Sequence, residues 1–369
     1  MELLSLISHN ILSFIVILSI IVFIHEFGHY FVAKKCGVKI DEFAIGFGKE
    51  LIGFNDKNGT RWKFCLLPFG GYVKMFGDRN PASIADSDKI KEMTQKEKKV
   101  SFFYQNVYKR MAIVLAGPIA NFILAILLFT AIFRIQGVTT ILPVIDSVIE
   151  NGAAKEAGLE SGDKIIKIGD KKISDFSQIQ QIIHQNADEK LDILIRRENK
   201  ELLFELTPKA SISKDFFGNE VKVGLIGVTA SKYDYQKLNL FDSFIKANQE
   251  SYNLSIAILG AIKDLIIGKR SIKELGGPVK IAQYSGKSVS MGFVVTLWFM
   301  AMISLNLGVL NLLPLPVLDG GHFFYYIIEA IKGKPLSQKI QQYGFQFGFG
   351  IILTLMLFTT YNDITGLFN

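Results

Sequence analysis

Long apolar runs separated by polar segments dominate the pattern of the chain. A helix needs about 20 apolar residues to cross a bilayer. The runs at 9–33, 107–133 and 291–318 reach that length, and a weaker, uncharged run follows at 344–361. Residues 1–24 contain no Lys or Arg, and no small-residue cleavage site follows, so the first run is expected to stay as a helix. The pattern predicts a polytopic α-helical membrane protein with four transmembrane helices.

The segments between these runs follow other patterns. Within the loop 34–106, residues 42–75 alternate apolar and other side chains around several glycines, which predicts a β-hairpin. Residues 78–100 are polar and charged, which predicts a linker. Segment 231–290 predicts amphipathic helices. Its most apolar part is short and contains two charged residues, so it is expected at the membrane interface.

Composition and charge support this interpretation and orient the chain. Hydrophobic residues make up 49% of the chain and charged residues 20%, a balance typical of membrane proteins. Residues 34–110 contain 16 Lys and Arg against 9 Asp and Glu. Because cytoplasmic loops carry the excess of Lys and Arg, the loops 34–106 and 319–343 are predicted in the cytosol, with both termini and residues 134–290 outside. The net charge of +7 comes without a basic–aromatic pattern, so we expect no nucleic-acid partner.

The first apolar run contains the motif His25-Glu26-Phe27-Gly28-His29. Helical residues four apart share a face, so both imidazoles can reach one metal ion, with Glu26 beside them. Zinc binds neutral imidazole nitrogens and lowers the pKa of its bound water to about 7, so that a nearby carboxylate can take the proton. One ionisable residue at mid-bilayer costs about 2.5–3.5 kcal/mol. Three of them together therefore indicate a metal site rather than chance burial.

A catalytic zinc ion normally has three protein ligands and one open position. The third apolar run ends in NLLPLPVLDGGH at 311–322. Both this run and the first are predicted to enter from outside, and His25 would lie roughly 20 Å along its helix at 1.5 Å per residue. Asp319 is expected at a similar depth, where two prolines interrupt the helix. His322 is an alternative ligand, and an ordinary Asp-Gly-Gly turn without metal is the other interpretation.

Two further segments add to these motifs. They are Gly117-Pro118-Ile-Ala-Asn121 in the second run and LGGPVKIA at 275–282, ahead of the third. Together with HEFGH and NLLPLPVLDGGH, they resemble the site-2 protease family of intramembrane zinc metalloproteases, in its bacterial branch of the regulator-of-sigma-E protease type. The resemblance covers most of the chain.

The resemblance implies a cofactor, site residues and partners. In the family, the two histidines and the Asp of LDG bind one Zn²⁺ and the Glu is the catalytic base, which implies these roles for His25, His29, Asp319 and Glu26. Asn311 corresponds to a family Asn that holds the substrate or the developing oxyanion. The implied partners are the lipid bilayer and transmembrane protein substrates, single-span and already cut outside, such as anti-sigma factors or remnant signal peptides. The implied location is the bacterial cytoplasmic (inner) membrane, with the active site towards the cytosol.

The outer region 135–230 carries a second resemblance. Residues 152–165 read GAAKEAGLESGDKI, a short Ala-rich helix followed by a Gly-Asp turn and a strand, and are similar to PDZ domains of the PxxAGLxxGDxI type. We expect an extracytoplasmic α+β PDZ domain that binds extended peptide by strand addition or acts as a structural spacer. The hairpin in 34–106 resembles the family's membrane-associated β-loop and is expected to present a sheet edge to unwound substrate.

Two other functions are compatible with parts of this pattern. One is a catalytically silent, membrane-anchored PDZ scaffold that binds peptides, although a scaffold would have no need of Glu26. The other is a metal transporter, which would favour polar residues in several spans, whereas the second and fourth runs contain almost none. The sequence therefore favours a zinc metalloendopeptidase that cuts membrane proteins.

Overall fold

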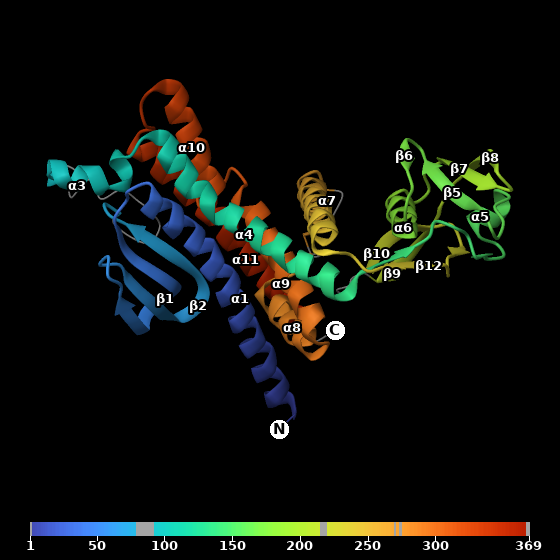
Figure 1. The fold of residues 1–369 in the computed structure, drawn as a ribbon, viewed down its shortest axis with the longest axis horizontal. Helices are drawn as coiled ribbons and strands as arrows, with labels where there is room; N and C mark the ends of the chain where they lie inside the picture. The colour runs from blue at the N-terminus through green and yellow to red at the C-terminus, as the bar shows by residue number, and fades with distance from the viewer. Residues whose placement is uncertain (1, 79–91, 215–219, 269–270, 273–274, 367–369) are drawn as a thin grey trace. The chain divides into compact units, whose positions relative to one another are not determined.

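Figure 1 shows the computed structural model of the chain, which describes residues 2–78, 92–214, 220–268, 271–272 and 275–366. The chain folds into two compact units. The first consists of Met1–Ile132 together with Leu240–Asn369, and the second is Phe133–Asn239. The first unit is therefore discontinuous in sequence, because the second is inserted into it.

Four of the described helices are long and apolar enough to cross a membrane. They are α1 (Glu2–Lys35), α4 (Val107–Gln136), α9 (Phe293–Asn311) and α11 (Gln338–Thr365). This confirms the prediction of four apolar helices of membrane-spanning length. α1 and α9 share a core in which Ile17, Ile21 and Met300 are buried, with partly buried side chains of α4 packed against it.

The third apolar run is longer than the helix it forms. α9 ends at Asn311, and the chain turns through residues 312–318 before α10 (Asp319–Lys332) begins. Pro314 and Pro316 lack the backbone N–H that would continue an α-helix. The predicted end at 318 therefore marks the end of the apolar run and not of the helix.

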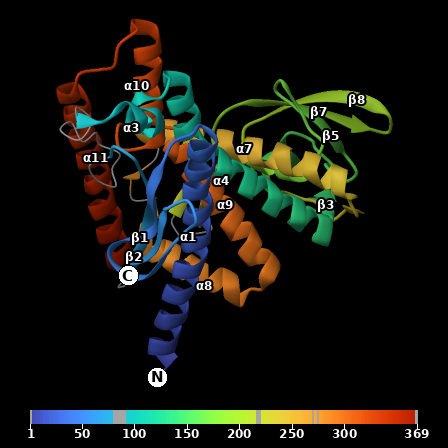
Figure 2. The ribbon, with the colours of Figure 1, turned by 60° about the vertical axis from the view of Figure 1, so that its left-hand side comes forward.

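Segment 231–290 contains the expected helices, α7 (Leu240–Ile266) and α8 (Pro278–Ser290), after a short strand. α8 begins at a buried carboxylate of α11, because the backbone N–H groups of Gly277 and Lys280 donate to Asp363 at 3.1 and 3.0 Å. Such a contact satisfies N–H groups that the first helical turn leaves unpaired. α8 also lies beside the first half of α1 (Figure 2).

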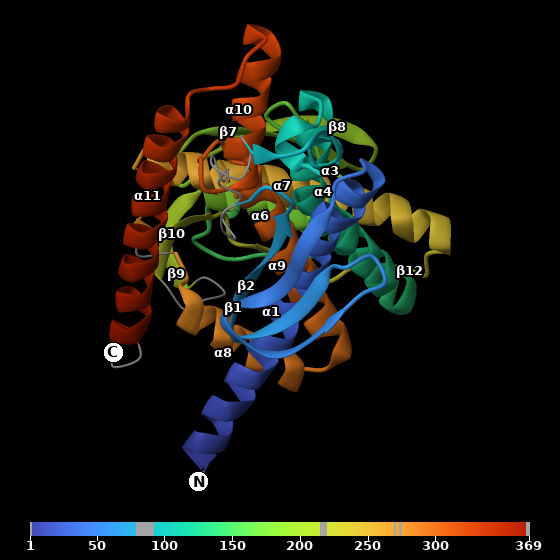
Figure 3. The same cartoon turned by 90° about the vertical axis from the view of Figure 1, so that its left-hand side faces the viewer.

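The predicted hairpin is present. β1 (Ile40–Asn55) and β2 (Arg61–Met75) pair antiparallel from Ile40↔Met75 to Asn55↔Arg61 and lie along α1 (Figure 3). Phe43 of β1 is buried against Tyr30 of α1. The hairpin is thus anchored to the helix that carries the HExxH motif.

The predicted linker 78–100 is partly helical. α3 (Gln95–Val100) starts with a capping box, in which Thr94 Oγ1 accepts from the Glu97 N–H and the Glu97 carboxylate accepts from the Thr94 N–H. A 3₁₀ turn, η1 (Phe102–Tyr104), follows. The rest of that prediction, at 79–91, falls outside the described residues.

The second unit is an α+β body on a four-stranded sheet of order β6-β5-β7-β8. Its core contains buried side chains of strands and of two helices, including Ile165 and Ile193 of the sheet, Ala154 of the first helix and Ile179 of the second. Pairing of its first and last strands, β3 and β12, extends the unit beyond the predicted end at 230. The elements are β3 (Val138–Ile141), β4 (Ser147–Val148), α5 (Ala153–Glu156), β5 (Lys164–Ile168), β6 (Lys171–Lys172), α6 (Phe176–Gln185), β7 (Leu191–Arg197), β8 (Lys200–Leu206), β9 (Lys209–Lys214), β10 (Glu220–Leu225), β11 (Val228–Thr229) and β12 (Tyr233–Gln236).

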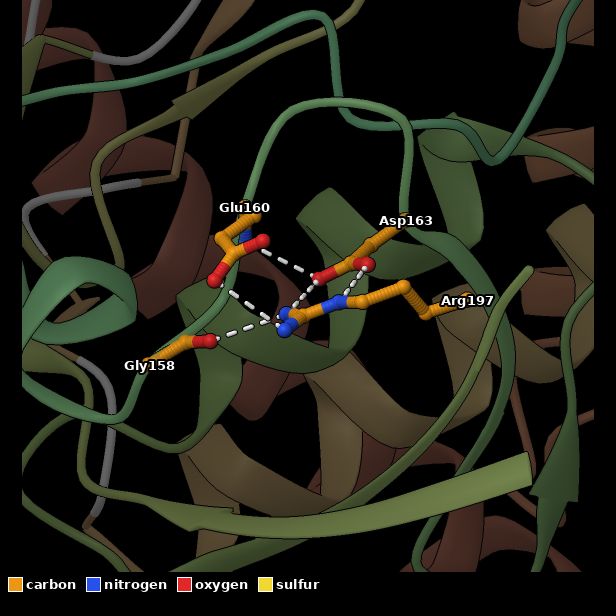
Figure 4. Close-up of polar contacts among 4 residues, drawn as sticks. All are labelled: Gly158, Glu160, Asp163 and Arg197. Atoms are coloured by element: carbon orange, nitrogen blue, oxygen red, sulfur yellow. Dashed lines mark hydrogen bonds and ion pairs between the residues drawn. The ribbon is translucent and has the colours of Figure 1, made fainter. Parts of the chain in front are cut away.

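Figure 4 shows how one arginine holds the turn between α5 and β5. The Arg197 guanidinium donates to both carboxylate oxygens of Asp163, at 2.7 and 2.8 Å, and to the carbonyl of Gly158 at 2.9 Å. Its Nη1 lies 3.1 Å from the carboxylate of Glu160. Asp163 is fully buried, and a paired, doubly hydrogen-bonded carboxylate is the form in which a buried charge is tolerated. The Gly-Asp turn found in the sequence is thus fixed by a residue of β7.

Candidate metal centre

Three side chains from two distant parts of the chain meet beside α4. His25 and His29 lie one helical turn apart on α1, and Asp319 is the first residue of α10. Asp319 Oδ2 lies 3.2 Å from His25 Nε2 and 3.4 Å from His29 Nε2, and the two Nε2 atoms are 3.3 Å apart. The three atoms form a nearly equilateral triangle. Within the part of the chain that the structure describes, these three residues are the cluster of His, Cys and acidic side chains that could hold a metal ion.

The size of this triangle fits zinc. Ligand atoms about 2.0–2.1 Å from a tetrahedral ion lie about 3.3 Å from one another, and the observed separations are 3.2–3.4 Å. Oδ2 of Asp319 is buried and has no hydrogen-bond partner within the described parts of the chain. Two imidazoles and one carboxylate are a common catalytic donor set, which leaves a fourth position open. The residues present therefore fit a catalytic zinc ion.

The protein backbone fixes one imidazole for this role. The Nδ1 atom of His29 lies 2.8 Å from the carbonyl oxygen of Ile113 on α4. A proton on Nδ1 leaves the lone pair of Nε2 free for the metal, and such an outer hydrogen bond also orients the ring. No motif predicted this contact, because every residue type has a backbone carbonyl.

Glu26 lies between the two histidines in the sequence and is 9% exposed. Strand β2 passes directly over it: a Cβ atom on Gly71 would lie 2.9 Å from Glu26 Cγ. Only a residue without a side chain allows the strand to come so close to the helix. Gly71 is a site residue that we did not predict, although a Gly-Gly pair inside a strand signals close backbone approach.

A cavity of about 630 Å³ connects these groups. Its walls come from α1, the hairpin β1–β2, η1, α4, α9, α10 and α11, together with the turn before α10. Asn311 and His322 both line the cavity. His322 is not part of the group of described residues that could hold a metal ion, which consists of His25, His29 and Asp319. The sequence-predicted residues on its wall are His25, Glu26, His29, Asn311, Asp319 and His322.

The local sequence explains how Asp319 reaches the site. Gly320 and Gly321 follow it, and a Cβ atom on either would overlap the backbone of the turn at 312–316. Without side chains at these two positions, α10 can begin tightly against the turn that ends α9. The Asp-Gly-Gly sequence thus serves both as a turn and as the start of a helix that presents the carboxylate.

Comparisons with known proteins agree with this chemistry. The sequence profile of peptidase family M50 matches residues 13–355. The chain is 39% identical to "Putative zinc metalloprotease Atu1380" of Agrobacterium fabrum, which covers 97% of this chain and 96% of the relative. It is 41% identical to "Putative zinc metalloprotease RC0203" of Rickettsia conorii (98% and 99% covered) and 32% identical to "Metalloprotease MmpA" of Caulobacter vibrioides (96% and 95% covered).

One solved structure is similar to part of the chain. It is the PDZ domain of an SdrC-like protein from Listeria monocytogenes, with 21% sequence identity and a TM-score of 0.19. The match covers 25% of this chain and 90% of that domain.

Proposed function

This chain belongs to peptidase family M50, the site-2 protease family, and we propose that it hydrolyses peptide bonds of membrane proteins at a zinc ion held by His25, His29 and Asp319. Membership makes it an intramembrane zinc metalloprotease. The observation that carries the assignment of residues is the triangle of ligand atoms with 3.2–3.4 Å sides. It lies in one cavity with Glu26.

The roles of the side chains follow from their places around the cavity. When zinc is bound, it polarises the scissile carbonyl and acidifies a water molecule. Glu26 accepts a proton from that water and passes it to the leaving amine, as a general base and then a general acid. Asn311 donates its side-chain N–H to the oxygen on which negative charge develops. Burial of these groups excludes bulk water and strengthens each of these interactions.

The hairpin suggests how substrate reaches the site. Residues 42–45 of β1 pair with both 61–64 and 71–74 of β2, so β1 has no free edge there. Within the described residues, segment 71–74 of β2 pairs on one side only, and residues 70–73 line the catalytic cavity. An extended peptide can add to such an edge by backbone hydrogen bonds. We propose that transmembrane substrates, single-span and already cut outside, unwind against β2. Anti-sigma factors and remnant signal peptides are the candidate classes.

The distribution of charge supports an orientation in the bilayer. α1 ends with Lys34 and Lys35, and α4 begins with Lys109 and Arg110 in its first turns, on either side of the hairpin loop. By the positive-inside rule these ends lie in the cytosol. We propose that the hairpin is cytosolic, that both termini and the second unit are extracytoplasmic, and that the membrane is the bacterial inner membrane.

We propose a PDZ fold for the second unit. The support is its α+β composition and the Asp163–Arg197 pair that fixes its AGLESGD turn. In this position it binds extended peptide or acts as a spacer that filters substrates by size.

The substitution Glu26→Gln tests the reaction. It keeps the shape of the side chain and removes the base, so cleavage of a model transmembrane substrate in detergent should fall by about 10²–10⁴-fold, with zinc content unchanged. Cleavage that survives this change contradicts the assigned role of Glu26. Bound zinc without cleavage of any substrate by the unmodified protein would favour the peptide-binding scaffold.

A further inference from the structure

Helix α4 presents one polar group to each imidazole of the metal centre. Ile113, Gly117 and Asn121 are spaced four residues apart, so they lie on one face of the helix. The carbonyl of Ile113 faces His29 Nδ1 at 2.8 Å. The side-chain amide of Asn121 faces His25 Nδ1 at 3.1 Å. Each histidine of the HExxH motif thus has its own partner on the neighbouring helix.

The Asn121 side chain is fully buried and only half satisfied. Its Nδ2 atom is the one that faces His25, while its Oδ1 atom is buried and has no hydrogen-bond partner within the described residues. The backbone is held separately, because Ser304 Oγ of α9 donates to the Asn121 carbonyl at 2.9 Å. An unpaired buried oxygen costs free energy and calls for an explanation. Helix packing alone does not supply one.

We propose that Asn121 is a positioning residue of the metal centre, whose side-chain oxygen accepts a hydrogen bond from Nδ1–H of His25 when Nε2 of that histidine binds zinc. This inference rests on the proposed zinc site. A metal-bound Nε2 carries no proton, so the proton of the neutral ring is on Nδ1 and needs an acceptor. Half a turn of the carboxamide exchanges its oxygen and nitrogen atoms. The oxygen then accepts the hydrogen bond from His25 Nδ1–H, and the amide nitrogen takes the position that the oxygen leaves.

The arrangement gives a role to the Gly-Pro-x-x-Asn segment, to which the proposed reaction assigns none. Gly117 gives the two rings room, since a Cβ atom there would overlap His29 and lie 2.9 Å from His25 Cε1. Asn121 then supplies for His25 the acceptor that the Ile113 carbonyl supplies for His29. Both rings are held with Nδ1–H towards α4 and Nε2 towards Asp319.

The test is the zinc affinity of the purified full chain in detergent, measured by competition with a chromophoric chelator. Asn121→Leu removes the acceptor and should weaken zinc binding by about 10–100-fold. Asn121→Asp keeps an acceptor oxygen at the same place and should stay within about threefold of the unmodified protein. The matched control is Thr130→Val, in the same helix, where the hydroxyl donates to the Ile126 carbonyl at 2.7 Å. It should leave zinc affinity unchanged.

Two results would overturn the inference: unchanged zinc affinity in Asn121→Leu, or equal losses in Asn121→Leu and a folded Asn121→Asp. A second measurement needs no variant. The chain has five histidines, and ¹⁵N-histidine NMR of the zinc-loaded protein should show both zinc-bound rings protonated on Nδ1. A zinc-bound ring without that proton contradicts the role of Asn121. An unmodified protein that binds no zinc would instead contradict the proposed function.

Discussion

Glycines set how closely the metal-binding helix can approach its neighbours. A Cβ atom on Gly28 would overlap the backbone of Ala116, and one on Gly117 would overlap the imidazole of His29. The absence of side chains at these two positions lets α1 and α4 approach until the histidines reach the polar groups of α4. The geometry of the proposed zinc ligands therefore depends on glycines that are not ligands in this proposal.

Gly117→Ala should weaken zinc binding by roughly tenfold or more, because the added methyl group displaces a ligand ring that α4 otherwise orients. Helix propensity acts in the opposite direction, because Ala stabilises a helix over Gly by about 1 kcal/mol. The control is Gly350→Ala in α11, where a Cβ atom would meet nothing within 4 Å. Chelator competition measures both variants. Equal zinc affinity in the two would show that the close approach at Gly117 has no bearing on the metal.

At this scale the sequence predicts contacts within one helix better than contacts between elements. The His25–His29 pair follows from helix periodicity alone, so the motif sufficed. Asp319 needed a depth argument and a family resemblance as well. The Gly-Gly pair signals a close approach of the strand at Gly71, but that the neighbour is Glu26 depends on how the strand crosses the helix.

The hairpin β1–β2 exposes apolar side chains near its tip, including Ile52, which is 75% exposed, and Phe54. Its turn is closed by one carboxylate: the N–H groups of Asn58 and Thr60 donate to Asp56 Oδ1 at 2.8 and 2.9 Å. An Asp that accepts from the backbone two and four residues on is a common way to fix a turn. The turn that sets the register of the hairpin is therefore held by a titratable group, the carboxyl group of Asp56.

Titration of Asp56 should occur well below the usual range. Burial raises the pKa of this carboxyl, but hydrogen bonds from Thr60, Asn58, Trp62 and Tyr30 outweigh it and lower the pKa to about 2. A lowered pKa in the folded state means that the stabilisation is complete above the ordinary pKa of about 3.9 and is lost as the pH falls through about 2.

Trp62 reports this titration, because its Nε1 lies 3.4 Å from Asp56 Oδ2. In a Trp298→Phe background, which leaves Trp62 as the one tryptophan of the chain, its fluorescence should change with a midpoint near pH 2. The Asp56→Asn variant should show no such step. A midpoint close to pH 4 would contradict the hydrogen-bonded turn.

The presence of helices and strands could be predicted where the pattern of apolar and polar residues alone determines it. Their ends were harder to predict. The alternation of residues 42–75 predicted the hairpin. The apolar run continues to residue 318, but α9 ends at Asn311, ahead of Pro314 and Pro316, the two prolines expected to interrupt it. α3 was missed because its polar residues pack little, and its capping box at Thr94 was the available signal.

On the scale of the whole molecule, the metal centre joins the two halves of a unit that is split in the sequence. His25 and His29 belong to the part before the inserted unit and Asp319 to the part after it. The four apolar helices were predictable because bilayer thickness fixes their length. That Asp319 of α10 lies beside the histidines of α1 could be predicted only with the depth argument and the family resemblance, since it depends on how helices distant in sequence pack. The orientation in the membrane stays a prediction from charge.

The central claim is that α1 and α10 together hold one zinc ion beside Glu26. X-ray absorption at the zinc edge of the purified, full-length protein, combined with metal content, tests this most directly. We predict one zinc ion per chain, with two imidazole nitrogens and one carboxylate oxygen at about 2.0–2.2 Å and a fourth light-atom ligand. A protein that binds no zinc, or a zinc ion whose surroundings lack the two imidazoles, would contradict the account.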